Sequence, residues 1–281
     1  MKYRKVVIIG TGLIGGSAGK ALIARGLAKE VVGICRRESS AERALKEKAV
    51  TSAVVGGYDS NCREADIVLV ATPVNAIIPA LEKLADCDMG ADTAVTDAGS
   101  TKGDIVLHAS KLEGKLRFVG SHPMAGSEKS GVENSSASLF EGSVCLLTPD
   151  ASTKPEVKKK ISDFWIALGA EVREMSPGDH DRGVAFSSHL PHAAAYALAG
   201  TLEEKLPRYL FAGGFRDTTR VASSDAALWS EIFDSNRGNV LKAIEKYREK
   251  LGVIEEEIRS GRKKDLLERL ERWRKLRDEI V

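Results

Sequence analysis

A histidine in a glycine-rich segment of this chain is well placed for acid–base chemistry. The segment 120–131 reads GSHPMAGSEKSG and contains His122. It follows an apolar run, so we expect a loop at the edge of a sheet. A histidine there can take a proton from a hydroxyl group as a carbonyl forms, because its pKa lies near neutrality. A structural histidine is the alternative, and this segment alone does not decide between the two.

Two further histidines, His189 and His192, lie in the segment 187–192, SSHLPH. In a helix they stand at positions i and i+3 and share a face. Pro191 should start or kink that helix, which would aim the pair into a cleft. No third ligand has suitable spacing, so we expect no metal site.

The segment 213–220, GGFRDTTR, places Arg216, Asp217 and Arg220 together after two glycines. An arginine fixed by a neighbouring carboxylate can clamp a substrate carboxylate through charge-assisted hydrogen bonds. A salt bridge on a helix surface is the alternative.

The N-terminal segment carries the pattern G-x-G-x-x-G between an apolar run and a helical one. In that context the first glycine allows a tight turn, the second lets the backbone approach a pyrophosphate, and the third lets helix pack on strand. We therefore predict a dinucleotide-binding turn. Its predicted cofactor-binding residues are Gly10, Gly12, Leu13, Ile14 and Gly15.

The end of the second predicted strand bears on the choice of dinucleotide. An NAD site usually has an acidic residue there for the ribose 2′-hydroxyl. This chain has Arg36 and Arg37 instead, and guanidinium groups suit a 2′-phosphate. NADP is favoured and NAD remains possible, because Glu38 could reach the ribose while the arginines stay solvated.

Polar residues also follow two later strands. Thr72 and Pro73 lie where open α/β sheets bind ligands, although turn chemistry alone would also explain them. Ser100 and Lys102 would face the nicotinamide side of the cleft. Read alone, however, Ser100 and Thr101 look like helix N-caps, and we favour that interpretation of the segment.

The elements that must position these residues form two regions. Apolar runs alternate with helical segments up to about residue 150, which predicts a Rossmann-type, doubly wound parallel sheet. A further helix and a short strand, Glu171–Met175, follow, and after 176–178 helical periodicity dominates. We predict a dinucleotide-binding domain over 1–177 and an all-α domain over 178–281. The predicted strands before residue 150 are Lys5–Ile9, Val31–Cys35, Ile67–Ala71, Ala94–Asp97, Arg117–Gly120 and Val144–Thr148.

Composition excludes several classes of partner. The 42 basic and 40 acidic residues leave a net charge of +2, which gives no argument for nucleic acid or an anionic membrane. No apolar run approaches the roughly 20 residues of a membrane span. The four cysteines are scattered, as reduced thiols of a cytoplasmic protein would be.

Taken together, these segments resemble the prephenate/arogenate dehydrogenase family over nearly the whole chain. The most specific are HPMAG from His122, HLP from His189 and FRDTTR from Phe215. The resemblance implies that His122 binds and deprotonates the ring hydroxyl, that Ser100 orients both groups, and that Arg220, positioned by Asp217, holds the ring carboxylate. It also implies a substrate pocket lined by Ser127, Glu128, Ser188, His189 and His192.

The resemblance further implies a helical domain that binds a small-molecule substrate and forms a homodimer. An apolar stripe on the last predicted helix matches that role: Leu266, Leu270, Trp273 and Ile280. Prephenate and arogenate both remain open as substrates, since Arg36–Arg37 looks like the arogenate-preferring branch and His192 like prephenate-using members. A β-hydroxyacid or imine-type dehydrogenase and a non-catalytic NADP sensor are the alternatives.

Overall fold

The computed structural model describes residues 1–127, 129–202 and 206–280, and the chain divides into two compact units, Met1–Asn236 and Arg237–Val281. Glu128, one of the predicted substrate contacts, lies outside the described residues. Within the described ranges, no helix combines the length and the apolar character needed to cross a membrane.

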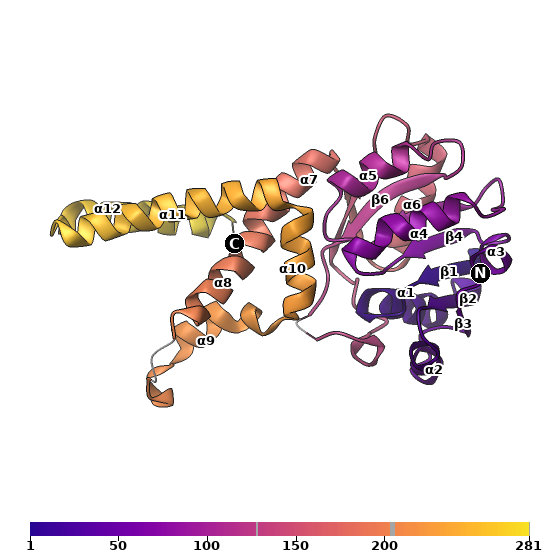
Figure 1. Cartoon of the computed structure of the whole chain (residues 1–281), viewed down its shortest axis with the longest axis horizontal. Helices are drawn as coiled ribbons and strands as arrows, with labels where there is room; N and C mark the ends of the chain where they lie inside the picture. Colours follow the sequence, from indigo (N-terminus) through magenta and orange to yellow (C-terminus); the bar gives the residue numbers. More distant parts are fainter. Residues whose placement is uncertain (128, 203–205, 281) are drawn as a thin grey trace. The chain divides into compact units, whose positions relative to one another are not determined.

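The first unit is built on one eight-stranded sheet with the order β3-β2-β1-β4-β5-β6-β7-β8 (Figure 1). Neighbouring strands from β3 to β6 are parallel, as the apolar runs predicted. The strands are β1 (Tyr3–Ile9), β2 (Ala28–Cys35), β3 (Ser52–Val55), β4 (Ile67–Val70), β5 (Ala94–Asp97), β6 (Phe118–Pro123), β7 (Val144–Thr148) and β8 (Glu171–Glu174). Of these, β3 was not predicted; it lies at the edge of the sheet, and none of its four residues is buried.

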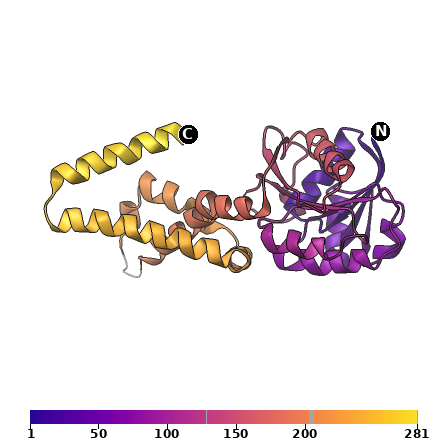
Figure 2. The same cartoon turned by 90° about the horizontal axis from the view of Figure 1, so that it is seen from above.

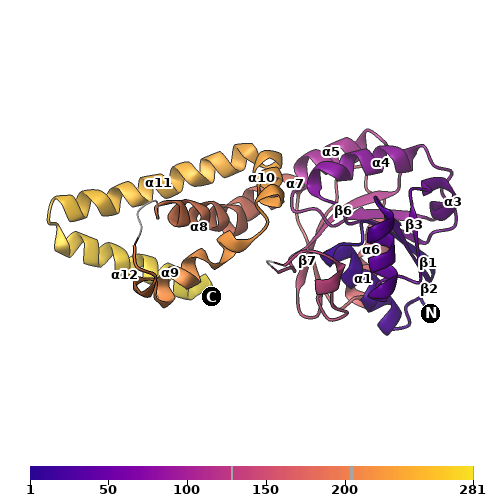
Figure 3. The same ribbon diagram turned by 60° about the horizontal axis from the view of Figure 1, so that its bottom comes forward.

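Helices cover both faces of the sheet, which explains why the strands are apolar on both sides (Figure 3). In β1, Val6 and Ile8 pack toward one helical layer, and Val7 and Ile9 pack toward the other. The first layer contains α1 (Leu13–Ala24), α2 (Glu38–Lys46) and α6 (Pro155–Ala167); the second contains α3 (Tyr58–Cys62), α4 (Ile77–Ala85) and α5 (Gly103–Ser110). Two short 3-10 turns, η1 (Val74–Ala76) and η2 (Val132–Asn134), lie in the connections.

The sheet is not parallel throughout, which corrects the prediction for Val144–Thr148. Strand β7 runs antiparallel to β6, and β8 runs parallel to β7. A parallel connection needs a crossover, usually a helix. Between β6 and β7 the described chain has only the three-residue turn η2, so it returns beside β6 in the opposite direction.

This return strand changes the place of His122. We expected the histidine in a loop, but it lies in β6, opposite Leu146 of β7. The prediction was wrong because β6 pairs with β7 beyond the point where its parallel pairing with β5 ends. His122 is therefore held by a strand ladder rather than by a loop.

Helices follow β8, as the change of pattern at 176–178 predicted. The first begins where the Ser176 hydroxyl accepts a hydrogen bond from the Asp179 amide, 3.0 Å away, with proline next in the chain. These elements are α7 (Pro177–Val184), the π turn η3 (Ala185–His189), α8 (Leu190–Gly200), η4 (Arg208–Leu210), α9 (Gly213–Thr219), η5 (Arg220–Ser223) and α10 (Ala226–Ser235).

The second unit is a helical hairpin of α11 (Arg237–Arg259) and α12 (Lys263–Ile280), drawn in yellow tones in Figure 2. Arg269 of α12 joins Glu257 of α11 at 2.7 Å, and its guanidinium lies over the Trp273 ring. The predicted apolar stripe lies on α12, where Leu270 and Ile280 are exposed. The hairpin thus leaves apolar side chains uncovered within this chain.

Candidate active site

The carboxyl ends of the parallel strands bring the N-terminal motifs to one edge of the sheet. Ile9, Val70 and Asp97 are aligned in register across β1, β4 and β5. The glycine turn after β1, Thr72 after β4 and Ser100 after β5 therefore follow the same edge. The strand order reverses direction beside β1, which is the place where open α/β sheets bind ligands.

The glycine turn packs as a dinucleotide-binding turn requires. Gly10 has φ +92°, and a Cβ there would lie 2.6 Å from the Ala71 carbonyl oxygen. A Cβ on Gly15 would lie 2.0 Å from the Gly10 carbonyl oxygen. A Cβ on Gly12 would meet nothing within 4 Å. The backbone is thus closely packed at Gly10 and Gly15 and open at Gly12, where a ligand would approach.

Two further features fit a bound dinucleotide. Helix α1 begins at Leu13 and Ile14 with no side-chain cap on its first amides, so these donors can serve a phosphate. The hydroxyl of Thr72 is buried without a hydrogen-bond partner among the described residues, while Pro73 beside it is exposed. An unpaired buried hydroxyl at this edge is suited to a ligand.

The two arginines lie directly beyond β2. The Gly10 amide donates to the Ile34 carbonyl at 3.0 Å, which places the end of β2 beside the glycine turn. Arg36 and Arg37 are both exposed, as is Glu38 at the start of α2. Both candidate partners of the adenine ribose are thus at the end of β2, and the geometry leaves the choice of dinucleotide open.

His122 forms a hydrogen-bonded series with two residues of α7. Its Nδ1 lies 2.8 Å from Nε2 of His180, and Nδ1 of His180 lies 2.8 Å from Oδ1 of Asp181. The ring centroids of the two histidines are 5.1 Å apart. His180 is fully buried and His122 is half-buried.

Asp181 also holds the start of α5. Its Oδ1 accepts from the Lys102 amide at 2.7 Å, and its Oδ2 accepts from the Gly103 amide at 2.8 Å. This corrects the prediction that Ser100 and Thr101 act as N-caps. The N-cap residue is Lys102, and the capping carboxylate comes from α7. The hydroxyl of Thr101 instead donates to Ser235 at 3.2 Å.

The Lys102 side chain is buried against β5 and β6. Its ammonium group pairs with Asp97 and donates to the Ser121 carbonyl at 2.9 Å. Both members of the ion pair are fully buried. Burial lowers the pKa of Lys102, and the charge of Asp97 opposes that change. The Lys102 side chain is therefore bonded to the backbone of the residue that precedes His122.

The electrostatic surroundings favour a neutral His122. Burial lowers its pKa well below the ordinary value of about 6.5, and the neighbouring His180, Lys102 and His189 act in the same direction. An imidazole with a lowered pKa stays unprotonated at neutral pH and can accept a proton.

The helical residues gather around Trp229. The His192 ring stacks on the Trp229 ring with 3.5 Å between the ring centroids. The His189 ring contacts Trp229 edge-on, with 6.0 Å between the centroids. Both histidines thus face the same neighbour, as expected for one helical face. Asn236 connects His189 to the hydrogen-bonded series of His122, His180 and Asp181. Its Nδ2 donates to the Asp181 carbonyl at 2.7 Å and to His189 Nδ1 at 3.2 Å.

Burial lowers the pKa of His192, and the positive charge of Arg220 acts in the same direction. His192 Nδ1 donates to the Ser188 carbonyl at 2.9 Å. Arg220, whose side chain is exposed, therefore lies within electrostatic range of His192.

Other predicted residues are less closely joined to it. Within the described residues, Ser100 and His122 share no hydrogen bond. Ser127 bonds to the backbone of Lys129 in an exposed segment, and Asp217 is exposed on α9.

Sequence reasoning missed His180, Asp181, Trp229 and Asn236. Residues 179–183 read DHDRG, which resembles a solvated helix surface, so nothing in the pattern marked His180 as buried.

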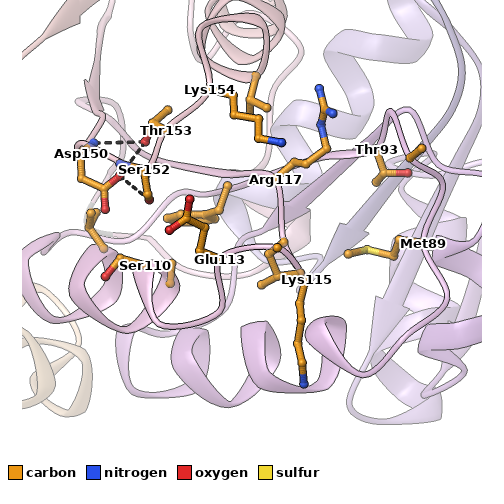
Figure 4. A pocket seen from close by; sticks show the side chains of 18 of the residues that line it. Met89, Thr93, Ser110, Glu113, Lys115, Arg117, Asp150, Ser152, Thr153 and Lys154 are labelled. Atoms are coloured by element: carbon orange, nitrogen blue, oxygen red, sulfur yellow. Dashed lines mark hydrogen bonds between the residues drawn. The ribbon is translucent and has the colours of Figure 1, made fainter.

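A cavity of about 340 Å³ lies elsewhere in the first unit (Figure 4). It is lined by the loops that precede β5 and β6 and by the loop between β7 and α6, with Arg117 and Lys154 among its residues. These loops lie at the amino ends of β5 and β6, away from the glycine turn. None of the predicted site residues lines this cavity.

The fold and site define a dinucleotide-binding oxidoreductase, and comparisons with known proteins give its family. Residues 18–174 match the nucleotide-binding domain of prephenate dehydrogenase, and residues 176–272 match the dimerisation domain of that family. The chain is 34% identical to prephenate dehydrogenase of Bacillus subtilis, over 89% of this chain and 68% of that protein.

Solved structures agree. A prephenate dehydrogenase from Aquifex aeolicus, in complex with hydroxyphenyl propionate and NAD+, is 35% identical with a TM-score of 0.92, covering 100% of this chain and 99% of that one. An arogenate dehydrogenase from Synechocystis is 31% identical with a TM-score of 0.83, covering 99% and 100%. The chain belongs to the prephenate dehydrogenase family and is a nicotinamide-dependent oxidoreductase.

The glycine turn yields a prediction that separates packing from ligand approach. Gly15→Ala should lower the free energy of unfolding by about 3 kcal/mol or more, because its Cβ meets a carbonyl oxygen. Gly12→Ala should change that free energy by less than about 1 kcal/mol and weaken cofactor binding instead. Urea unfolding and cofactor titration measure both quantities. Equal stability losses would contradict the assignment of separate roles.

Proposed function

We propose that this chain is a prephenate dehydrogenase that converts prephenate to 4-hydroxyphenylpyruvate in tyrosine biosynthesis, with NADP favoured and NAD possible. The observation that carries the proposal is the position of His122. It lies at the carboxyl end of β6, on the edge of the sheet that the glycine turn follows, with burial lowering its pKa and with Nδ1 engaged by His180. An unprotonated imidazole beside a nicotinamide is suited to deprotonating a secondary alcohol.

The reaction needs only the substrate, the oxidised nicotinamide and the imidazole of His122. His122 takes the proton of the ring hydroxyl as the carbon–oxygen double bond forms, and the hydrogen on the same ring carbon would leave as a hydride to the oxidised nicotinamide. The ring carboxylate leaves as carbon dioxide, and the electrons of its bond make the ring aromatic. The resulting phenoxide takes back the proton from His122, which returns the imidazole to its starting state.

The remaining predicted residues would bind the two ends of the substrate. We assign Ser100 to the ring hydroxyl and Arg220, positioned by Asp217, to the ring carboxylate. Charge supports this assignment, since a dianionic substrate needs cationic donors. The side chain of the substrate is assigned to Ser127, Glu128, Ser188, His189 and His192.

Arogenate is the alternative substrate, with tyrosine as the direct product or with both substrates accepted. One solved relative is an arogenate dehydrogenase at 31% identity. The two substrates differ only in the side chain, where an amino group replaces a keto group. The residues proposed to contact that side chain would therefore decide the preference.

We further propose that residues 1–177 bind the dinucleotide and that residues 178–281 bind substrate and form a homodimer in the cytoplasm. The exposed apolar side chains of the hairpin, including Leu267, Leu270 and Leu276, support a second copy as the covering surface. The match of residues 176–272 to a dimerisation domain supports the same assignment.

An assay matrix of two substrates against two cofactors tests the proposed activity. We expect production of reduced nicotinamide and carbon dioxide in equal amounts with prephenate, arogenate or both. No turnover of either substrate with either cofactor would contradict the proposal and favour the NADP-sensor alternative.

His122→Asn should lower kcat about 10²- to 10⁴-fold, as expected for loss of a general base. Cofactor affinity should stay nearly unchanged, because the glycine turn is untouched. His108→Asn is the control, since His108 lies on α5 beside Glu82 and outside the site. Steady-state kinetics and cofactor titration give the result, and retained turnover in His122→Asn would remove this residue from the base role.

Replacing both Arg36 and Arg37 with alanine should weaken NADP binding about 10- to 100-fold, since charge-assisted hydrogen bonds to the 2′-phosphate are lost. NAD binding should change much less. Arg43→Ala on α2, the helix that follows the two arginines, is the control, because that arginine bonds to the Ser39 carbonyl. Titration with each cofactor decides the matter, and equal weakening of both would show that the two arginines do not read the phosphate.

A further inference from the structure

The hydrogen bonds of Asp181 restrict where the protons of the histidine pair can lie. An ionised carboxylate accepts hydrogen bonds and donates none. Burial acts to raise the pKa of Asp181, but bonds from His180 and from the Gly103 and Lys102 amides outweigh it, so the pKa is lowered. Asp181 is therefore ionised at neutral pH, and the His180 Nδ1 that faces it must carry a proton.

That constraint passes along the series to His122. When His180 carries one proton, the one that Asp181 holds on Nδ1, its Nε2 is unprotonated and can only accept. The His122 Nδ1 that lies 2.8 Å from this atom must then be the donor. A neutral His122 that donates from Nδ1 has its lone pair on Nε2. The second nitrogen, which is not used by the relay, is thereby left as the base.

We infer that His180 and Asp181 are positioning residues that fix the tautomer of His122 so that Nε2 is free to accept the substrate proton. The inference rests on the proposed function for the identity of that proton. It deepens the proposed function by naming the groups that set the base. The imidazolium formed in the reaction would be stabilised through the same series, because His180 accepts from it and Asp181 supports His180.

Burial and further hydrogen bonds hold His180 and Asp181 in the orientation that this series requires. His180 is fully buried, so water does not compete for its ring nitrogens. The carbonyl of Asp181 accepts from Asn236, and both carboxylate oxygens accept from amides at the start of α5. The carboxylate is thus held from several sides and cannot turn away from His180 without losing buried hydrogen bonds.

A role limited to capping α5 is the alternative for Asp181. In that case the tautomer of His122 would not depend on Asp181 or His180. Asp181→Asn separates the two roles. An amide nitrogen in the place of Oδ1 would donate to His180 and give up the bond from the Lys102 amide, while the amide oxygen in the place of Oδ2 would still accept from the Gly103 amide. A donor facing His180 Nδ1 would move the His180 proton to Nε2, which would then donate to His122 Nδ1. The proton of His122 would lie on Nε2.

Nitrogen-15 NMR of histidine-labelled protein without substrate measures the tautomer directly. His122, assigned by its absence in His122→Asn, should carry its proton on Nδ1 at neutral pH in the native chain. In Asp181→Asn the proton should move to Nε2. A native His122 with its proton on Nε2, or a tautomer unchanged by Asp181→Asn, would overturn the inference.

Kinetics give a second readout. Asp181→Asn should lower kcat about 10²- to 10⁴-fold, the range expected when general-base catalysis is lost; replacing the aspartate of a serine-protease triad by asparagine costs about 10⁴-fold. KM and cofactor affinity should change little. Asp179→Asn is the matched control, since Asp179 is an exposed carboxylate of the same helix that pairs with Arg182. A loss confined to KM, or an equal loss in Asp179→Asn, would contradict the positioning role.

His180→Gln and His180→Leu keep the test decisive if Asp181→Asn does not fold. A glutamine oxygen can still accept from His122 Nδ1, whereas leucine cannot, so kcat should be higher in His180→Gln than in His180→Leu. Equal values would overturn the inference. Because the NMR result needs no substrate, a chain with the expected tautomer but no turnover would refute the proposed function and leave the positioning role standing.

Discussion

The buried carboxylate of Asp181 is the interaction on which the geometry of the site depends. A charge removed from water is tolerated only where donors replace its hydration. Here the donors are the backbone of Lys102 and Gly103, the positive end of α5, and the His180 ring. One side chain therefore fixes α7 against the turn after β5 and sets the hydrogen bonding of His122.

The buried Asp97–Lys102 ion pair stabilises the turn after β5 and the end of β6. Asp97 accepts from the Gly99 amide at 2.8 Å and from the Ser121 amide at 3.2 Å, so it shapes both the turn after β5 and the strand before His122. Removing one partner of such a buried pair typically costs about 3–5 kcal/mol, because the other charge is left uncompensated. The position of the proposed base is thus tied to the stability of the sheet edge.

The sequence was informative where the physics is local. The glycine spacing at Gly10, Gly12 and Gly15 predicted the turn, because the strand, the turn and the helix are contiguous in the sequence and Gly15 packs against the Gly10 carbonyl five residues before it. The apolar runs predicted the doubly covered sheet for the same reason. The proline and cap at the start of α7 marked the change to helices.

It failed where the deciding contact comes from far along the chain. His122 is in a strand because β7 returns beside it, and no local pattern shows the direction of β7. Lys102 rather than Ser100 is the N-cap of α5, because the capping carboxylate, Asp181, lies 78 residues from Gly103. His180 and Asp181 stand in a polar helix whose burial is decided by these distant partners.

The most direct test of a neutral, desolvated His122 is the pH dependence of kcat/KM for the substrate at saturating cofactor. A base with a lowered pKa remains unprotonated through neutrality, and activity is lost only as the pH falls through that lowered value. We predict a plateau that extends below pH 6.5, with the acid limb beneath the ordinary histidine value of about 6.5. An acid limb at or above that value would contradict the proposal that His122 is a neutral, desolvated base.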